Sequence, residues 1–365
     1  MILRRLQAQG FRNIESCDIS FESGVNLLVG ENAQGKTNAM ECIYYFARGK
    51  SFRGSSDASL IRYGDCGFSA SISFCSNERE QTLSYTLENG VRDRRRNGVP
   101  LKKLSEMLGH FRAVLFFPEH LQIIKAGPYE RREFLNIAIS QNNPLYIGLY
   151  SEYNRILENR NILLKYAQKG LYVDTAELDA WSEQMARVAA RIYMHRLSYV
   201  RGLAPYAEAI LRDLSGQRET LSLSYLADIQ AEGEEEAYLA YLKLLESERG
   251  REMAAGYSLF GIHRDDLEVE INGHSAREFG SQGQQRSCVL ALKMAEGEYS
   301  RVLTGEYPVF LFDDVLSELD EKRRSYVLGD TGERQFILSA CERLPENSGY
   351  HEIRVEGGRY VSTHR

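Results

Sequence analysis

The sequence predicts an α/β protein in which the two ends of the chain fold together as one lobe and a mainly helical segment is inserted between them. Three observations predict this fold. A complete G-x-x-x-x-G-K-T pattern spans residues 30–37, an apolar run at 309–312 ends in two acidic residues, and apolar residues recur at three- and four-residue spacing from about 129 to 250. The helical segment lacks sustained heptads, so we expect no long coiled coil.

The composition is that of an ordinary globular protein. The chain has 365 residues and a formal net charge of −6, enough for two or three domain-sized units. No apolar run approaches the ~18 residues of a membrane span, and the first residues lack the apolar core of a signal peptide. We therefore expect a cytoplasmic protein with no membrane partner. The six cysteines form no C-x-x-C pair and are expected to be buried thiols.

Apolar and alternating runs predict the strands. In chain order they are Leu3–Leu6, Ile19–Phe21, Val25–Val29, Phe68–Phe74, Thr82–Leu87, Val114–Phe117, Glu268–Ile271, Val309–Phe312 and Gln335–Leu338. Helical spacing predicts helices at Asn38–Ala47, Leu145–Leu164, Leu178–Arg201 and Tyr238–Leu245, with another after Gln284. We expect residues 1–118 and 300–365 to form the first lobe, a mixed β-sheet around the glycine-rich loop, and residues 119–299 to form the helical lobe.

The glycine-rich loop is the most specific motif. It reads Gly30-Glu31-Asn32-Ala33-Gln34-Gly35-Lys36-Thr37, after an apolar strand and before an apolar helix. Its glycines let backbone N–H groups converge on phosphates, and the helix N-terminus adds partial positive charge. Lys36 is expected to reach the β- and γ-phosphates of ATP, and Thr37 to ligate Mg²⁺. A glycine-rich turn without a ligand is the alternative, which both flanking elements disfavour.

Two acidic residues end the apolar run Val309–Phe312. A buried strand that delivers an acid at its carboxyl end supplies the second Mg²⁺ contact of a P-loop fold, and Asp313 is expected to do so. Asp314 would lie beside the γ-phosphate and polarise the attacking water, which makes it the candidate catalytic residue together with Lys36. The alternative is a pair of acids that caps the next helix.

A second turn of small residues, at 280–286, opens an apolar helix just before the acidic strand. Such a turn at a helix N-terminus suits an anion. Ser281 is also a good helix cap, and the two roles are compatible.

These motifs together resemble the RecF family of bacterial recombination-repair proteins, which carries an ABC-type ATPase head. The resemblance covers essentially the whole chain. It rests on GENAQGKTN at 30–38, Phe11-Arg12-Asn13, the segment 118–135 with Arg131-Arg132, His263-Arg264-Asp265-Asp266, SQGQQR at 281–286 as the ABC signature, and residues 317–320 as the D-loop. It implies that the helical lobe carries the signature.

The resemblance also implies functional residues outside the loop itself. Arg12, Asn13 and Asn38 would join residues 30–37 at the nucleotide. Ser281, Gly283 and Gln284 would contact the nucleotide held by a second copy of the chain, and Asp320 would act from the D-loop. Arg131-Arg132 is expected to have a structural or interface role.

Three positions depart from the usual ABC pattern. Asp314 replaces the catalytic glutamate of transporter ATPases and is one methylene shorter, so slow hydrolysis is expected. No convincing glutamine of a Gln-loop follows Phe117. The switch histidine is missing, and Ser339 or Cys341 stands in its place.

The function implied by the resemblance is that of an ATP-dependent homodimer on double-stranded and gapped DNA. With RecO and RecR it would promote RecA loading at single-strand gaps, and slow, DNA-dependent ATP hydrolysis would release it. The alternatives are the ATP-binding subunit of a transporter and the head of an SMC-like chromosome protein.

A basic cluster after a hairpin signal supplies the candidate DNA contacts, which are Arg94, Arg95, Arg96, Lys102 and Lys103. Such clusters bind phosphates without reading sequence. A solvated charged surface is the alternative.

Overall fold

Strands from both ends of the chain build one sheet in the computed structural model, which describes residues 1–54, 56–329, 331–343 and 349–363. Its order is β15 (Arg359–Thr363), β14 (His351–Glu356), β3 (Val25–Val29), β13 (Gln335–Ala340), β12 (Val309–Phe312) and β8 (Ala113–Phe116). All neighbours from β14 to β8 are parallel, and β15 alone pairs antiparallel. Every residue of β8 and β12 is buried, as expected for parallel strands covered on both faces.

A second sheet is wholly antiparallel and comes from the first hundred residues. Its order is β2 (Ile14–Ser20), β1 (Ile2–Phe11), β4 (Gly67–Ser76), β5 (Arg79–Glu88), β6 (Val91–Arg96) and β7 (Val99–Pro100). Side chains along β4 and β5 alternate between buried and more exposed positions, so one face of this sheet covers a core.

Helix α1 (Lys36–Arg48) lies in the core that joins the two sheets. Ten of its 13 residues are buried, which marks a helix enclosed on nearly all sides. Its Ile43 belongs to one apolar cluster with Ile72 of the antiparallel sheet and Leu311 of the parallel sheet. The loop that precedes α1 therefore rests on a rigid base.

Helices α8 (Gln282–Thr304) and α9 (Glu321–Leu328) also belong with the parallel sheet. Gly297 of α8 packs so closely on β12 that a Cβ there would lie 2.1 Å from the ring of Phe310. Four short 3₁₀ turns complete this part of the chain in the described residues, at Asp57–Leu60, Leu104–Glu106, Pro118–Leu121 and Leu316–Glu318.

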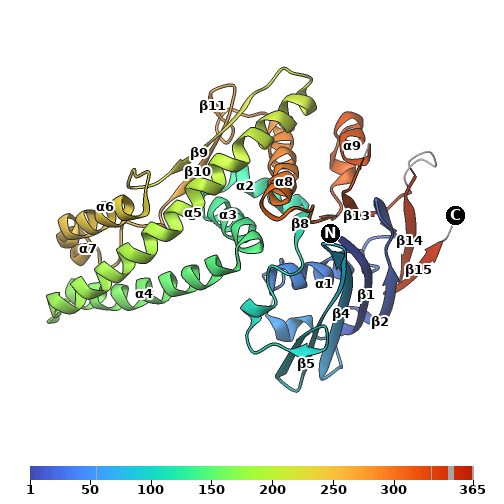
Figure 1. The fold of residues 1–365 in the computed structure, drawn as a ribbon, viewed down its shortest axis with the longest axis horizontal. Coiled ribbons are helices and arrows are strands. Elements are labelled where there is room, and N and C mark those ends of the chain that lie inside the picture. Colours follow the sequence, from blue (N-terminus) through green and yellow to red (C-terminus); the bar gives the residue numbers. More distant parts are fainter. Residues whose placement is uncertain (55, 330, 344–348, 364–365) are drawn as a thin grey trace. The chain divides into compact units, whose positions relative to one another are not determined.

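The chain divides into two compact units (Figure 1). Unit 1 holds Met1–Leu121, Tyr206–Glu219 and Gln282–Arg365, and unit 2 holds Gln122–Pro205 and Thr220–Ser281. The ends of the chain thus fold together around an inserted, mainly helical part, as the sequence predicts. The division falls at other residues than the predicted 118/119 and 299/300 boundaries. Residues 282–299 group with unit 1, because they form most of α8 and α8 packs on the parallel sheet.

Unit 2 combines helices with a small sheet. The helices are α2 (Gln122–Lys125), α3 (Pro128–Asn142), α4 (Pro144–Gln168), α5 (Thr175–Ser215, shared with unit 1), α6 (Glu234–Ser247) and α7 (Arg249–Ala255). The antiparallel sheet has the order β11 (His274–Ser275), β10 (Asp266–Ile271) and β9 (Leu221–Leu226). Pro205 lies inside α5 at the point where the helix passes from one unit to the other.

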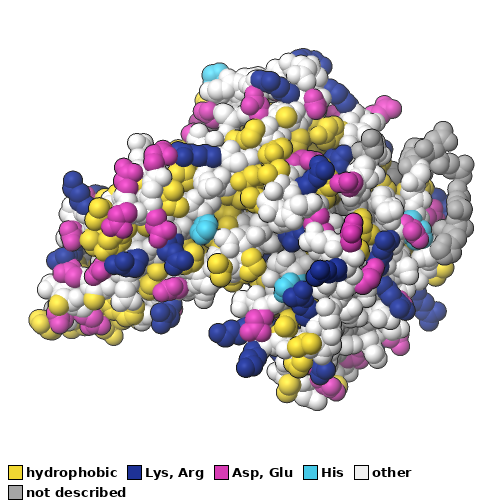
Figure 2. All heavy atoms as spheres, viewed as in Figure 1, with side chains coloured by type: hydrophobic (Ala, Val, Ile, Leu, Met, Phe, Trp, Pro, Cys, Tyr) yellow, Lys and Arg dark blue, Asp and Glu magenta, His cyan; other side chains and the backbone are white. Residues whose placement is uncertain are grey.

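The face of the molecule drawn in Figure 2 is mixed in charge and also carries hydrophobic side chains. Figure 2 shows Lys and Arg side chains interspersed with Asp and Glu over the face it draws. Among the helices of the described ranges, none is both long and apolar enough to cross a membrane. The six cysteines are free thiols, of which Cys42 and Cys288 are buried and Cys66 and Cys341 are exposed, so the expected burial holds for only part of the set.

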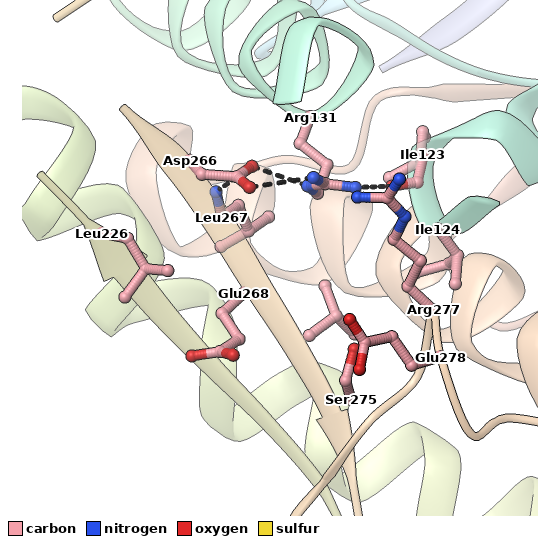
Figure 3. Close-up of a pocket in the computed structure, with 11 residues that line it drawn as sticks. Ile123, Ile124, Arg131, Leu226, Asp266, Leu267, Glu268, Ser275, Arg277 and Glu278 are labelled. Carbon is pink, nitrogen blue, oxygen red and sulfur yellow. Dashed lines mark hydrogen bonds and ion pairs between the residues drawn. The ribbon is translucent and has the colours of Figure 1, made fainter. Parts of the chain in front are cut away.

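Two motifs that are far apart in the sequence meet in unit 2. The guanidinium of Arg131 makes a two-pronged ion pair with Asp266, at 2.6 and 2.8 Å, and Arg132 donates to the backbone oxygen of Asp265 at 2.7 Å. Figure 3 shows the Arg131–Asp266 pair at one end of a cavity of about 160 Å³ beside β10. Both arginines therefore connect α3 to the start of β10, Arg131 through Asp266 and Arg132 through the residue just before the strand, which is a structural role.

A buried ion pair joins helices α4 and α7 of unit 2. Arg160 of α4 and Glu252 of α7 are both fully buried and lie 2.6 Å apart. Arg160 also donates to the hydroxyls of Ser182 and Ser258, so each of its three guanidinium nitrogens has an acceptor on another segment.

Replacing Glu252 by alanine leaves the Arg160 guanidinium buried without its counter-charge. We expect the free energy of unfolding to fall by about 3–5 kcal/mol. Glu183→Ala, which removes one half of the exposed Arg187–Glu183 pair, is the matched control and should cost less than about 1 kcal/mol. Urea denaturation followed by helical circular dichroism measures both, and equal effects of the two replacements would contradict a structural role for the buried pair.

Candidate nucleotide-binding site

The glycine-rich loop lies at the carboxyl edge of the parallel sheet. Strands β3, β13 and β12 are adjacent and parallel, so the residues that follow them meet at one edge. Gly30 follows β3, Asp313 follows β12 and Cys341 follows β13. Ligands of open α/β sheets bind at this edge, next to strand ends such as these.

The loop curls around the ammonium group of Lys36. This side chain is 3 % exposed, and its Nζ donates to the backbone oxygens of Gly30 at 2.6 Å and Glu31 at 3.0 Å. Ala33 and Gly35 have φ angles of 65° and 119°, in the left-handed region that lets the chain turn back on itself. At Gly30 a Cβ would lie 2.2 Å from the backbone oxygen of Val355, so packing alone requires glycine there.

Thr37 and Asp313, the residues predicted to ligate Mg²⁺, lie in contact. The Thr37 hydroxyl donates to Asp313 Oδ1 at 3.1 Å, and the Ser339 hydroxyl donates to the same oxygen at 2.6 Å. Burial raises the pKa of Asp313, and the two hydroxyl hydrogen bonds oppose that shift. A carboxylate beside a hydroxyl is a set of hard oxygen ligands that fits Mg²⁺ completed by phosphate oxygens and water. Within the described ranges no cluster of three or more His, Cys, Asp or Glu offers a metal site made of protein alone.

Asp314, the candidate catalytic residue, has an uncommon backbone conformation. Its φ is 52°, its N–H donates to Ser339 Oγ at 2.9 Å, and its Oδ1 lies 3.3 Å from the same oxygen. Left-handed φ angles in residues other than glycine are uncommon and, when the surroundings hold them, concentrate at functional sites. Ser339 is fully buried and contacts both Asp313 and Asp314, so one hydroxyl helps to fix the positions of both acids.

The two candidates for the switch position have different surroundings. The Ser339 hydroxyl is hydrogen-bonded to both Asp313 and Asp314. The thiol of Cys341 lies 3.7 Å from Lys36 Nζ and donates to Asn32 Oδ1 at 3.1 Å, so it faces the loop. Neither placement establishes a γ-phosphate sensor, which stays a prediction for either residue.

The last two strands support the outer side of the loop. Between β14 and β15, the N–H of Gly358 donates to the backbone oxygen of Gln34 at 2.9 Å and that of Gly357 to Gln34 Oε1 at 2.6 Å. The Tyr360 hydroxyl donates to the backbone oxygen of Gly35 at 2.9 Å. The sequence gives a turn signal at Gly357-Gly358 but no sign of this long-range pairing, so these residues were not predicted.

Asn13 and Asn38, predicted at the nucleotide, touch each other and the loop. Asn38 Nδ2 donates to Asn13 Oδ1 at 2.7 Å, and Asn13 Nδ2 donates to the Ala33 oxygen at 3.4 Å. Arg12 makes a two-pronged pair with the buried carboxylate of Glu41, at 2.7 and 3.0 Å. Its guanidinium thus fastens the β1–β2 turn to α1, and a nucleotide contact by Arg12 stays a prediction.

The signature and D-loop residues lie at helix starts. Ser281 is exposed and immediately precedes α8, whose first turn contains Gly283 and Gln284. Gln284 donates to Glu219 at 3.0 Å. Asp320 is exposed and caps α9 by accepting from the N–H of Arg323 at 2.9 Å.

The basic cluster is divided by its strand. Arg94, Arg95 and Arg96 lie on β6, where successive side chains point to opposite faces. Arg94 stacks over the ring of Tyr85 at 5.3 Å, and Arg96 is within 3.3 Å of Gln81 on the same sheet. Arg95 lies on the other face and pairs with Asp93 at 2.7 Å.

The predicted cluster is therefore not one projecting patch. Its exposed members are Arg95, Lys102 and Lys103, whereas Arg94 and Arg96 are partly buried.

The fold and this edge of the sheet define the class, which is an ATPase head of the ABC and SMC type. Residues 2–344 match the family model described as the RecF/RecN/SMC N terminal domain. The solved Smc head domain of Pyrococcus furiosus shares the fold, with a TM-score of 0.58 at 17% identity over 99% of this chain and 96% of that chain.

Relatives of higher similarity identify the family. The DNA replication and repair protein RecF of Desulfitobacterium hafniense is 37% identical over an alignment 366 positions long, gaps included, which covers 98% of this chain and 99% of that protein. A solved structure of the recombination mediator protein RecF with ATPrS matches with a TM-score of 0.92 at 31% identity, over 99% of this chain and 98% of that one. The chain belongs to the RecF family. This membership speaks against the transporter subunit and the SMC head as alternatives.

The Tyr360 contact makes a prediction about the loop. Tyr360→Phe removes the hydroxyl that bonds the Gly35 oxygen, a loss of about 0.5–1.5 kcal/mol of local stability. We expect faster amide hydrogen exchange in residues 30–36, by about two- to tenfold, with unchanged exchange in β12. Tyr63→Phe, at a fully exposed tyrosine, is the control. Unchanged exchange in the loop would show that the C-terminal strands do not support it.

Proposed function

We propose that this chain is an ATP-dependent DNA-binding protein of recombinational repair, in which ATP assembles two copies of the chain on DNA. One observation carries the proposal. Thr37 Oγ1 and Asp313 Oδ1 lie 3.1 Å apart at the carboxyl edge of the sheet, beside the loop that encloses Lys36. Family membership and the nucleotide-bound relative support the same conclusion.

The loop residues would bind the triphosphate of ATP. Backbone N–H groups of residues 30–36 and the start of α1 supply the partial positive charge that phosphates need. Lys36 would exchange its two backbone oxygen partners for the β- and γ-phosphates. Thr37 and Asp313 would hold Mg²⁺, which when bound neutralises charge on the phosphate oxygens.

Hydrolysis is proposed to be slow and to act as a release step. Asp314 would orient the attacking water, with its carboxylate position fixed by the buried Ser339 hydroxyl. The aspartate is shorter than the glutamate of transporter ATPases, so its reach toward the water is less. We therefore propose weak ATPase activity, and family membership supports its dependence on DNA.

The dimer is proposed to share its nucleotide sites. Ser281, Gly283 and Gln284 of one chain would contact the γ-phosphate bound to Lys36 of the other, with Asp320 nearby. The exposure of Ser281 and Asp320 supports this role, because a residue that acts on a second chain must be accessible in the first. A ligand that binds only the dimer shifts the equilibrium toward it.

The biological role would follow from the family. We place the dimer on double-stranded and gapped DNA, where it acts with RecO and RecR to promote RecA loading at single-strand gaps. The matched relative is described as a recombination mediator in the RecFOR pathway.

The shared site predicts the effect of two single replacements. Lys36→Met removes the phosphate contact and Ser281→Arg blocks the signature turn, so each should abolish ATP-dependent dimerisation in sedimentation velocity. Lys165→Met, at an exposed lysine of α4, should dimerise with ATP but not ADP, as the parent chain does. A chain that remains monomeric with ATP, or dimerises equally without it, would refute the switch.

The exposed members of the basic cluster predict a salt-dependent DNA contact. Replacing Arg95, Lys102 and Lys103 together by alanine should weaken duplex binding at least tenfold with ATP present. The slope of log affinity against log salt should become shallower by about 2–3, since each lost phosphate contact removes about 0.9. Fluorescence anisotropy over a salt series measures both effects.

The matched control for this replacement removes three exposed cations of unit 2, Lys165, Lys169 and Arg251. If the two triple variants bind duplex DNA equally, the basic cluster is not the DNA contact. Stimulation of ATP turnover by duplex DNA in the parent chain gives an independent check, because a transporter subunit would be indifferent to DNA.

A further inference from the structure

One side chain connects the D-loop to the first turns of the signature helix within unit 1. Arg323 of α9 donates through Nη1 to Asp320 Oδ2 at 2.7 Å. Its Nη2 donates to the backbone oxygen of Gly283 at 2.9 Å and to Ser287 Oγ at 2.7 Å, and its Nε donates to Ser287 Oγ at 2.9 Å. All three guanidinium nitrogens are therefore engaged.

The geometry of these contacts requires arginine. A guanidinium presents its donors in one rigid plane, whereas an ammonium is a single point on a flexible stem. Here that plane joins a carboxylate on one side to a backbone oxygen and a hydroxyl on the other. The guanidinium is mostly shielded, with 19% of the side chain exposed, so solvent screens these bonds less than on an open surface.

The two segments that Arg323 joins are those proposed to act on the partner chain. Gly283 lies in the signature turn, and Asp320 lies in the D-loop and caps α9. Each segment alone is a helix start, whose position depends on what it packs against. Arg323 links the two segments directly, because one guanidinium is hydrogen-bonded to both.

We propose that Arg323 is a positioning residue that holds the signature turn and the D-loop as one rigid piece, which completes the nucleotide site of a second copy of this chain. In this role Arg323 acts through the groups that it contacts, which are Gly283, Ser287 and Asp320. This inference rests on the proposed shared site. It adds that the trans-acting half of that site depends on a side chain outside both motifs.

The proposal separates two activities of one chain. Arg323→Ala leaves residues 30–38 and Asp313 untouched, so ATP binding by the monomer should stay within about twofold of the parent. The ATP-dependent dimer and ATP turnover should weaken by about 10- to 100-fold, since several charge-assisted hydrogen bonds are lost. Arg323→Lys should recover only part of this loss.

Mixing two defective chains provides the decisive test. Lys36→Met lacks the phosphate contact but keeps an intact signature and D-loop, and Arg323→Ala has the opposite defect. In a mixed dimer, Lys36 of the Arg323→Ala chain meets the intact signature and D-loop of the Lys36→Met chain. We expect the mixture to regain ATP turnover well above the sum of the two separate chains.

Two controls make the outcomes distinct. Ser281→Arg mixed with Lys36→Met tests the shared site itself. Lys322→Ala removes an exposed charge from the same turn of α9 and should match the parent in every assay. Ser287→Ala removes one acceptor of Arg323 without removing a charge and should weaken turnover more mildly, with the same recovery on mixing.

Recovery with both Arg323→Ala and Ser281→Arg supports the proposal. If only the Ser281→Arg mixture recovers, Arg323 acts within its own chain, and the positioning role in trans is wrong while the shared site stands. If neither mixture recovers, the shared site itself fails and the inference falls with it. Full turnover by Arg323→Ala alone would also overturn it. Thermal unfolding of each variant identifies a chain that has merely failed to fold.

Discussion

The parallel pairing of β3, β13 and β12 is the constraint on which the candidate site depends. Strand pairing fixes the register of β3, near the start of the chain, against β13 and β12, near its end, and all three strands end at one edge of the sheet. Asp313 then sits where the hydroxyls of Thr37 and Ser339 both reach one of its oxygens. Burial of this carboxylate without those donors would be costly, so the same bonds stabilise the fold and prepare the site.

Patterns that are local in the sequence identified the loop and the acidic strand end that the structure brings into contact, and the roles of these residues at a nucleotide stay predictions. The loop at 30–37 and the apolar strand before Asp313 are each recognised from a short contiguous segment. The fold class then predicts that the two segments lie at the same edge of the sheet. Every predicted strand and helix overlaps an observed element. Because successive side chains of a strand point to opposite faces, the sequence also predicts that Arg95 points away from Arg94 and Arg96. Treating the basic cluster as one patch missed this prediction.

Local sequence patterns do not predict contacts between segments that are far apart in the sequence. Nothing near Tyr360 indicates that its hydroxyl bonds Gly35. Neither β14 nor β15 was expected, because both strands are short and β14 is rich in charged residues. Arg12 was assigned to the nucleotide by resemblance, whereas its partner Glu41, the single acidic residue of α1, was not considered. The boundary at 281/282 depends on how α8 packs, which periodicity does not encode.

The support of the loop by the last strands has a consequence for the newly made chain. The loop is complete once residue 37 has been synthesised, but Asp313, Ser339 and Tyr360 follow on the order of tens of seconds later at ordinary translation rates. Until then Thr37 lacks its carboxylate and the outer side of the loop lacks its hydrogen bonds. A nascent or prematurely ended chain therefore carries the loop sequence without the contacts that hold the loop in place. We expect such a chain to bind nucleotide more weakly than the full-length chain.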